Sequence, residues 1–171
     1  MNLRRFLHPE GIRLELQTRA LPEGADADDF EVETAQNLAR IRQGVFTELV
    51  ELFEISGCMA NQKRLLKEFE EREKKTSCAL GQGIALPHLR TLQLKRFILV
   101  FCRSSEGLPF GAPDEEPVHL FFGMAAPPYD DRTYLKVYKA LAKVLLDPVN
   151  SEGFMNAQEP SEILRLLEVV C

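Results

Sequence analysis

The chain has 171 residues, of which 45% are hydrophobic and 27% are charged, and its formal net charge is −5. This length and composition are typical of one well-cored globular domain, so we expect residues 1–171 to form a single domain. No basic run and no membrane-length apolar stretch occurs, which argues against a nucleic-acid partner and against direct membrane insertion. The basic N-terminus precedes no apolar segment and so lacks the pattern of a signal peptide, and we expect a cytoplasmic protein.

Residues that commonly bind metals or form disulfides are scattered along the chain. The cysteines include no C-x-x-C pair and lie at Cys58, Cys78, Cys102 and Cys171. The histidines have no recognisable ligand spacing and lie at His8, His88 and His119. We therefore expect free thiols, no metal and no cofactor.

The first predicted element is a short strand. Residues 9–11 have the composition of a turn, and apolar and charged residues then alternate over 12–16, which predicts a strand with one buried face. The acidic segment near 17–30 is rich in small residues and predicts an extended, solvated loop.

Two helices are predicted next. From about Glu31, apolar residues recur three or four positions apart until Gly57, a typical stop signal. Asn61 is a typical cap for a second helix, which we expect to end near Lys75.

Arg72 is the most informative residue of the second helix. It follows Leu65 by seven residues and Phe69 by three, so the helical period places it on the apolar face. A charge there needs an anion or a partner, because burying it unpaired is costly. The alternative is a side chain that snorkels and keeps its guanidinium in water. The acidic neighbours, Glu73 among them, are free to point outward.

Residues 81–88 read Gly-Gln-Gly-Ile-Ala-Leu-Pro-His. A polar, glycine-bearing loop over 76–82 leads into a short apolar run that stops at Pro87, and His88 follows at once. We interpret the run as a strand that ends by presenting the His88 ring at the edge of a sheet. Two hypotheses are open for this ring: a nucleophile that accepts a phosphoryl group, or a residue that merely terminates a buried strand.

The rest of the chain alternates between strands and helices. Apolar runs predict buried strands over 96–102 and 117–124, and we interpret His119 as a packing or hydrogen-bonded residue. A helix is then expected from Asp130–Asp131, followed by a short segment around Phe154 and a last helix from about Pro160 to Val170. This order predicts an α/β fold, a sheet with helices on both faces.

The residue types around His88 suit a phosphohistidine. Such a site needs a neutral imidazole and cationic or N–H donors around the phosphate. The chain offers His88, Arg72, the Ser77 hydroxyl and the backbone of residues 81–83. It has no Walker loop and no G-x-S-x-G motif, so kinase and hydrolase hypotheses lack support.

Several of these residues together resemble a known family, the IIA domains of the fructose–mannitol class in the bacterial phosphoenolpyruvate-dependent sugar phosphotransferase system (PTS). The similar pattern consists of Arg72-Glu73, Thr76-Ser77, Leu80-Gly81 and residues 83–88. It continues through segments 97–102, 106–111, 118–126 and 162–167, and spans roughly residue 8 to the C-terminus. The resemblance implies a mixed central β-sheet sandwiched by helices, and it favours the phosphoryl hypothesis for His88.

The resemblance also implies roles for single residues. The family's phosphorylated histidine matches His88, which would take its phosphate from the phosphocarrier protein HPr or a paralogue. The family's helix-borne arginine matches Arg72, and its usual threonine falls near Ser77. The phosphate would then pass to a IIB partner, so we expect a phosphotransferase component of sugar transport with a phosphohistidine intermediate.

Three features depart from the family pattern. Tyr134 replaces the usual second histidine; its hydroxyl can hydrogen-bond a phosphate but carries no positive charge near neutral pH. Leu89 stands where a small residue is usual, and the loop near 17–30 is longer. These departures leave open a regulatory IIA protein, nitrogen-regulatory-like or degenerate, that binds and controls a partner with phosphorylation as a switch or absent. A third hypothesis is thiol chemistry at Cys78.

Overall fold

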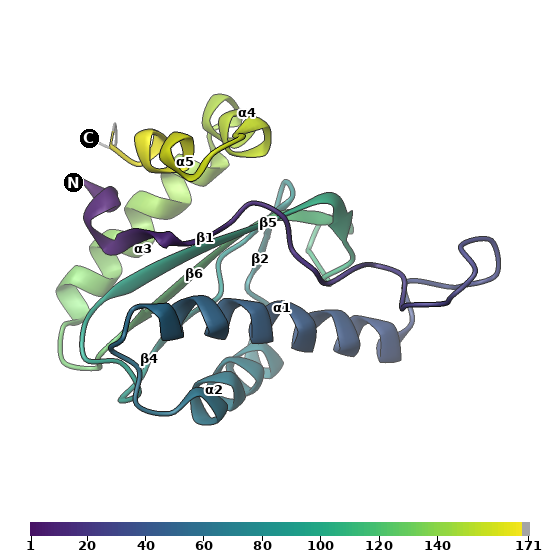
Figure 1. The fold of residues 1–171 in the computed structure, drawn as a ribbon, viewed down its shortest axis with the longest axis horizontal. Helices are drawn as coiled ribbons and strands as arrows, with labels where there is room; N and C mark the ends of the chain where they lie inside the picture. The colour runs from purple at the N-terminus through teal and green to yellow at the C-terminus, as the bar shows by residue number, and fades with distance from the viewer. Residues whose placement is uncertain (169–171) are drawn as a thin grey trace.

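The computed structural model describes residues 1–168 as a six-stranded mixed sheet covered by helices on both faces (Figure 1). The helices are η1 Leu3–Phe6, α1 Ala35–Ile55, α2 Gln62–Lys75, α3 Asp131–Leu146, α4 Pro148–Asn156 and α5 Pro160–Leu166. The strands are β1 Leu7–Arg13, β2 Ala79–Gly81, β3 Ile84–Ala85, β4 His88–Arg90, β5 Ile98–Leu108 and β6 Val118–Ala126. The expected fold class is confirmed. Val170 and Cys171, named in the sequence predictions, lie outside the described residues.

The strand order is β1-β5-β6-β3-β2, and β4 also pairs with β6. Strands β5 and β6 form the antiparallel centre, while β1 runs parallel to β5. Strands β3 and β4 pair in parallel with successive parts of β6, so that Ala85 lies opposite Phe121 and His88 opposite Met124. The two strands therefore follow one track along β6, interrupted at residues 86–87.

His88 opens β4, so the prediction that it ends a strand was wrong. The preceding Pro87 has no N–H to donate to a ladder, which interrupts the pairing there. Its carbonyl still accepts a hydrogen bond from the Met124 N–H at 2.8 Å, so the chain stays attached to β6. The consequence for the site is that a strand continues beyond His88 toward Arg90.

Each face of the sheet has its own core. Helices α1 and α2 cover one face, where Phe69 stacks on Phe46 and Phe53 at ring-centroid distances of 6.0 and 5.8 Å. Helices α3, α4 and α5 cover the other face, where Phe154 packs on Phe101 and Phe122 (Figure 1). Because side chains alternate along a strand, β5 and β6 contribute to both cores.

Several strand boundaries differ from the predictions, including the end of β1 at Arg13 and not at residue 16. Strand β1 begins at Leu7 and includes residues 9–11, which were expected to form a turn. Its register with β5 shifts between Leu7 and Ile12. Pro9 is tolerated because β1 is an edge strand. Strand β5 continues to Leu108, beyond the expected end at residue 102, because pairing with β6 resumes after a register shift. Strand β2 also forms within the loop expected over 76–82.

The helix ends follow local capping. Helix α1 starts later than the expected Glu31, because the Thr34 hydroxyl accepts a hydrogen bond from the Asn37 N–H at 3.2 Å. The predicted stop at Gly57 is confirmed by its φ of +69°, a conformation that glycine adopts readily. Asn61 caps α2 as predicted, with its side chain accepting from the Arg64 N–H at 3.0 Å.

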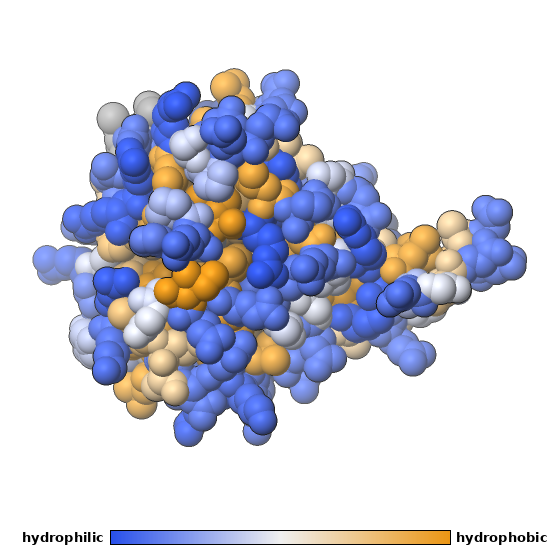
Figure 2. Space-filling view, viewed as in Figure 1, coloured by the Kyte–Doolittle hydropathy of each residue, from blue (hydrophilic) through white to orange (hydrophobic). Residues whose placement is uncertain are grey.

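The predicted loop near 17–30 lies between β1 and α1 and projects past the start of α1 (Figures 1 and 2). Its base is anchored by Glu48, whose side chain is 7% exposed. The Glu48 carboxylate accepts hydrogen bonds from the Gln17 and Thr18 N–H groups at 2.8 and 2.9 Å and pairs with Arg13 at 3.0 Å. Within residues 1–168, no helix is long and apolar enough to cross a membrane.

Candidate functional site

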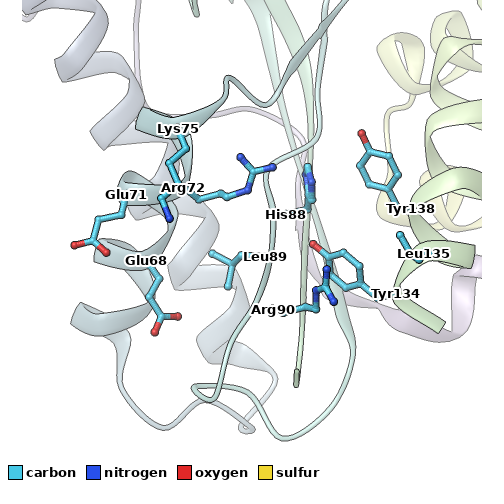
Figure 3. A pocket seen from close by; sticks show the side chains of 10 residues that line it. All are labelled: Glu68, Glu71, Arg72, Lys75, His88, Leu89, Arg90, Tyr134, Leu135 and Tyr138. Carbon is cyan, nitrogen blue, oxygen red and sulfur yellow. The ribbon is translucent and has the colours of Figure 1, made fainter. Parts of the chain in front are cut away.

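A cavity of about 560 Å³ opens between α2, β4 and α3 (Figure 3). Its lining consists of Glu68, Glu71, Arg72, Lys75, His88, Leu89, Arg90, Tyr134, Leu135 and Tyr138. The fold thus brings together three of the residues singled out in the sequence, Arg72, His88 and Tyr134. Helix α2 supplies cationic and acidic side chains, whereas α3 supplies two phenol rings.

The His88 ring is fixed in one tautomer. Its Nδ1 lies 2.7 Å from the carbonyl oxygen of Leu86. A carbonyl can only accept, so Nδ1 carries the proton and Nε2 keeps a free lone pair. Burial lowers the pKa of His88 below its ordinary value, and the charges of Arg72 and Arg90 act in the same direction. A neutral imidazole with one free nitrogen is a nucleophile.

Arg72 is half-buried and points toward His88 from α2 (Figure 3). Its guanidinium donates to the Thr76 carbonyl at 3.4 Å, at the end of the helix, and lines the cavity. Both hypotheses for this side chain, an accompanying anion and a guanidinium kept in water, are compatible with this position at the open cavity. The planar guanidinium has further N–H donors for an anion.

Two tyrosines of α3 pack against the imidazole. The Tyr138 ring centroid lies 4.7 Å from that of His88, and the buried Tyr134 ring lies at 6.3 Å. Burial raises the pKa of Tyr134 to about 12, so its hydroxyl remains protonated at neutral pH. Arg90 lies over the Tyr134 ring at 4.9 Å and donates to the Asp131 carboxylate, which orients a second guanidinium at the cavity.

Ser77 and the glycine loop lie elsewhere. Ser77 is exposed, its hydroxyl accepts from the Ala79 N–H at 3.2 Å, and it does not line the cavity. Residues 81–83 all have positive φ and form the tight turn between β2 and β3, where the Gln82 N–H donates to the Asp114 carboxylate at 2.7 Å. The hairpin therefore turns the Gln82 amide toward Asp114.

Sequence reasoning missed several lining residues, although each had a signal. Arg90 shares a strand face with His88, because side chains two apart in a strand point the same way. Lys75 follows Arg72 by three residues, and Tyr138 follows Tyr134 by four, which are both same-face spacings in a helix. The first signal was hidden because we expected the strand to end at His88.

Glu73 differs from expectation, and its position bears on Cys78. The Glu73 side chain is 7% exposed and points inward, where its carboxylate accepts a hydrogen bond from the Cys78 N–H at 2.9 Å. Burial raises the pKa of the Cys78 thiol well above its ordinary value. A thiol held in its protonated form is a poor nucleophile, which argues against thiol chemistry. Within residues 1–168, no group of three or more His, Cys, Asp or Glu residues could hold a metal ion.

Residues 31–169 match the family model described as "Phosphoenolpyruvate-dependent sugar phosphotransferase system, EIIA 2". The chain is similar to the PTS system fructose-specific EIIA component of Haloferax volcanii, at 26% identity over 75% of this chain and 84% of that protein. It is 25% identical to the fructose-specific EIIABC component of Bacillus subtilis over 74% of this chain. That match spans only 20% of the Bacillus protein.

Solved structures share the fold. The nitrogen regulatory protein IIA-Ntr from Neisseria meningitidis aligns with a TM-score of 0.77 and 25% identity, over 98% of this chain and 99% of that chain. Enzyme IIAMTL from Escherichia coli, solved in complex with phosphorylated enzyme IIBMTL, aligns with a TM-score of 0.64 and 22% identity, over 94% and 95% of the two chains. These proteins combine the same mixed sheet with helices on both faces.

Proposed function

Because this chain belongs to the EIIA 2 family of the phosphoenolpyruvate-dependent sugar phosphotransferase system, we propose that it carries a phosphoryl group on His88. One observation carries the proposal most strongly. The His88 Nδ1–H is held by the Leu86 carbonyl at 2.7 Å, which leaves Nε2 free at a cavity lined by two guanidinium groups. A neutral imidazole can attack phosphorus, and cationic side chains stabilise the phosphoryl oxygens, so this arrangement suits phosphoryl transfer.

In the proposed step, the His88 Nε2 lone pair attacks phosphorus and a new N–P bond forms. The bond between phosphorus and the donor atom breaks, and its electron pair leaves with the donor. Arg72 and Arg90 neutralise the charge on the phosphoryl oxygens, and the Tyr134 hydroxyl is available as a hydrogen-bond donor. The proton on Nδ1 stays in place, so no base is needed. We assign no direct contact to Ser77, which lies outside the cavity.

The donor in this proposal is HPr or a paralogue, and the acceptor is a IIB partner. The family description and the complex of enzyme IIAMTL with phosphorylated enzyme IIBMTL support this pair of partners. The proposal includes a single domain, which is supported by the one sheet around which residues 1–168 fold. It also includes a location in the cytoplasm, where the family's partners would be met. The fructose-specific names of two relatives favour a role in sugar transport.

The second candidate is a regulatory IIA protein that binds and controls a partner. The likeness to IIA-Ntr over almost the full length of both chains favours it. The replacement of an expected imidazole by Tyr134 favours it as well. A pull-down from cell lysate with the phosphorylated and unphosphorylated chain separates the two candidates. Recovery of a membrane permease or IIB protein supports transport, whereas a kinase or transcriptional regulator supports regulation.

Phosphorylation itself is tested with phosphoenolpyruvate, enzyme I and HPr. The wild-type chain should gain one acid-labile phosphate, and His88→Ala should gain none, because the substitution removes the imidazole that accepts the phosphoryl group. His8→Ala is the matched control, since His8 is exposed and lies outside the cavity. Uptake of phosphate by His88→Ala would show that the acceptor has been misassigned.

A further inference from the structure

A buried carboxylate lies behind the His88 site. Helix α2 buries the apolar Leu65 and Phe69 against the core. Most of its other residues are charged, yet the Glu73 side chain is only 7% exposed. Glu73 Oε2 accepts the Cys78 N–H at 2.9 Å, while Oε1 is buried without a hydrogen-bond partner among residues 1–168. The Arg42 guanidinium lies 3.9 Å from Oε1, close enough for an ion pair but too far for a hydrogen bond. Keeping a charge in this position is costly, which indicates a role.

A chain of hydrogen bonds joins this carboxylate to the imidazole. Glu73 holds the Cys78 N–H at 2.9 Å, and the Cys78 carbonyl accepts the Leu86 N–H at 2.9 Å. The Leu86 carbonyl in turn accepts the His88 Nδ1–H at 2.7 Å. Each of the two intermediate residues is held through both its N–H and its carbonyl, so the placement of one limits the placement of the next.

Glu73 and His88 also border the same small cavity. This space of about 10 Å³ is enclosed by apolar and polar groups alike and includes Arg72 in its lining. Arg72 and Glu73 are neighbours in the sequence, but they lie toward different nitrogens of the imidazole ring. Arg72 lines the open cavity reached by Nε2, whereas Glu73 holds the backbone that binds Nδ1.

We propose that Glu73 is a positioning residue for phosphoryl transfer, which acts through Cys78 and Leu86 to fix the tautomer and orientation of His88. The chain passes through successive residues and not through one conjugated group, so its effect on the ring is geometric. Separately, the Glu73 charge acts to raise the pKa of His88. Leu86 lies in the two-residue interruption between β3 and β4, where its N–H donates to the Cys78 carbonyl and not to β6. This inference rests on the proposed function. It is tested by two experiments: a kinetic one that requires phosphoryl transfer, and a structural one that does not.

The structural experiment is the ¹⁵N NMR spectrum of the His88 side chain in the unphosphorylated protein at neutral pH. The wild type should contain the Nδ1–H tautomer. Glu73→Ala should shift a measurable fraction to the Nε2–H tautomer, because the Leu86 carbonyl is no longer held. Glu73→Gln should retain the wild-type tautomer, since its amide oxygen still accepts the Cys78 N–H.

The kinetic experiment is single-turnover phosphorylation by phosphorylated HPr. Glu73→Ala should be slower than wild type by roughly tenfold, the scale of one lost charged hydrogen bond, and Glu73→Gln should lie close to wild type. Glu70→Gln is the matched control, because it removes the same charge from the same helix outside both His88 cavities. If the wild type takes no phosphate, the proposed function fails, while the NMR experiment still decides the role of Glu73.

Unfolding of Glu73→Ala is detected by circular dichroism. If Glu73→Ala is unfolded, Glu73→Asp is measured in its place, because the shorter side chain keeps the charge but withdraws the carboxylate by one methylene. The same tautomer shift, to a smaller extent, is then expected. A folded Ala or Asp variant with the wild-type tautomer and the wild-type rate overturns the proposal.

Discussion

The pKa of His88 results from opposing interactions at a single residue. Burial disfavours the imidazolium, and the two guanidinium groups act in the same direction, whereas the Leu86 carbonyl favours it. Burial is the largest of these effects, so the pKa in the folded protein lies below the ordinary value of about 6.5. The ring is therefore neutral, and ready to attack, over a wider pH range than a free imidazole.

The first prediction follows from this shift. Single-turnover phosphorylation of the wild type should retain more than half of its neutral-pH rate at about pH 6.5, where a free imidazole is half protonated, and fall to half only at a lower pH. As the pH falls from 6.5 toward the lowered pKa, the unfolded chain binds a proton that the folded chain does not. His88 therefore reduces stability in that window, and stability recovers as pH rises. An NMR titration midpoint of His88 at or above 6.5 would contradict this.

The second prediction concerns Arg90, which the sequence analysis did not single out. Arg90→Gln should slow phosphorylation by roughly 100-fold, the scale of one hydrogen-bond donor removed from a transition state, and Arg90→Lys should be affected less. Asp131→Asn tests the contact between Arg90 and the Asp131 carboxylate. The guanidinium keeps its charge but loses the carboxylate that orients it, so a smaller decrease in the phosphorylation rate is expected. Rates from rapid-quench measurements check the order. Equal rates for wild type and Arg90→Gln would remove Arg90 from the site.

At the scale of the element, α2 positions both the cation and the buried carboxylate. Its first turn depends on Asn61, whose side chain accepts the Arg64 N–H at 3.0 Å, while Leu65 and Phe69 fix its rotation against the core. Arg72 and Glu73 follow from that rotation. They are adjacent in sequence and about 100° apart around the helix, which is why one reaches the cavity and the other the core.

The third prediction tests the start of this helix. Asn61→Ala should lower the free energy of unfolding by about 1 kcal/mol, because the cap is lost, and urea denaturation measures the change. Asn61→Asp is the matched control, since an aspartate also caps a helix and its charge suits the N-terminus. Stability loss of the same size in both variants would mean that capping is not the cause.

At the scale of the whole molecule, the sheet separates two cores, and α1 approaches it closely at Gly123 of β6. A Cβ atom at this position would lie 2.7 Å from the Val100 side chain and 3.3 Å from those of Leu49 and Phe53. The backbone of Gly123 has no positive φ. The absence of a side chain is therefore a packing requirement, and it determines how near α1 lies to the sheet.

The fourth prediction follows from this contact. Gly123→Ala should lower the free energy of unfolding by about 1–3 kcal/mol through overpacking, as measured by urea denaturation. Adding Val100→Ala makes room for the new methyl group. The double variant should therefore lose less stability than the sum of the two single variants. Simple additivity would show that the methyl group is accommodated in another way.

Much of the fold follows from the sequence because its signals are local. The cap at Asn61, the stop at Gly57 and the helical periods depend on residues within one or two turns, and they were predicted correctly. The boundaries of β1 and β5 were not, because bulges allow pairing to continue past residues that resemble turns. The division at Pro87 was also missed: β3 and β4 are short, and only their common partner β6 shows that they follow one track.

By itself, the sequence determined the family, the fold class, and the pairing of His88 with Arg72 as candidates, since these depend on motifs and on helical spacing. Only the tertiary structure decided which other side chains meet them. It places Arg90 and Tyr138 at the cavity, leaves Ser77 outside, and buries Glu73 behind the imidazole. The physical reason is that local patterns fix the direction of a side chain relative to its own helix or strand. The neighbour that it meets depends on how separate elements pack against one sheet.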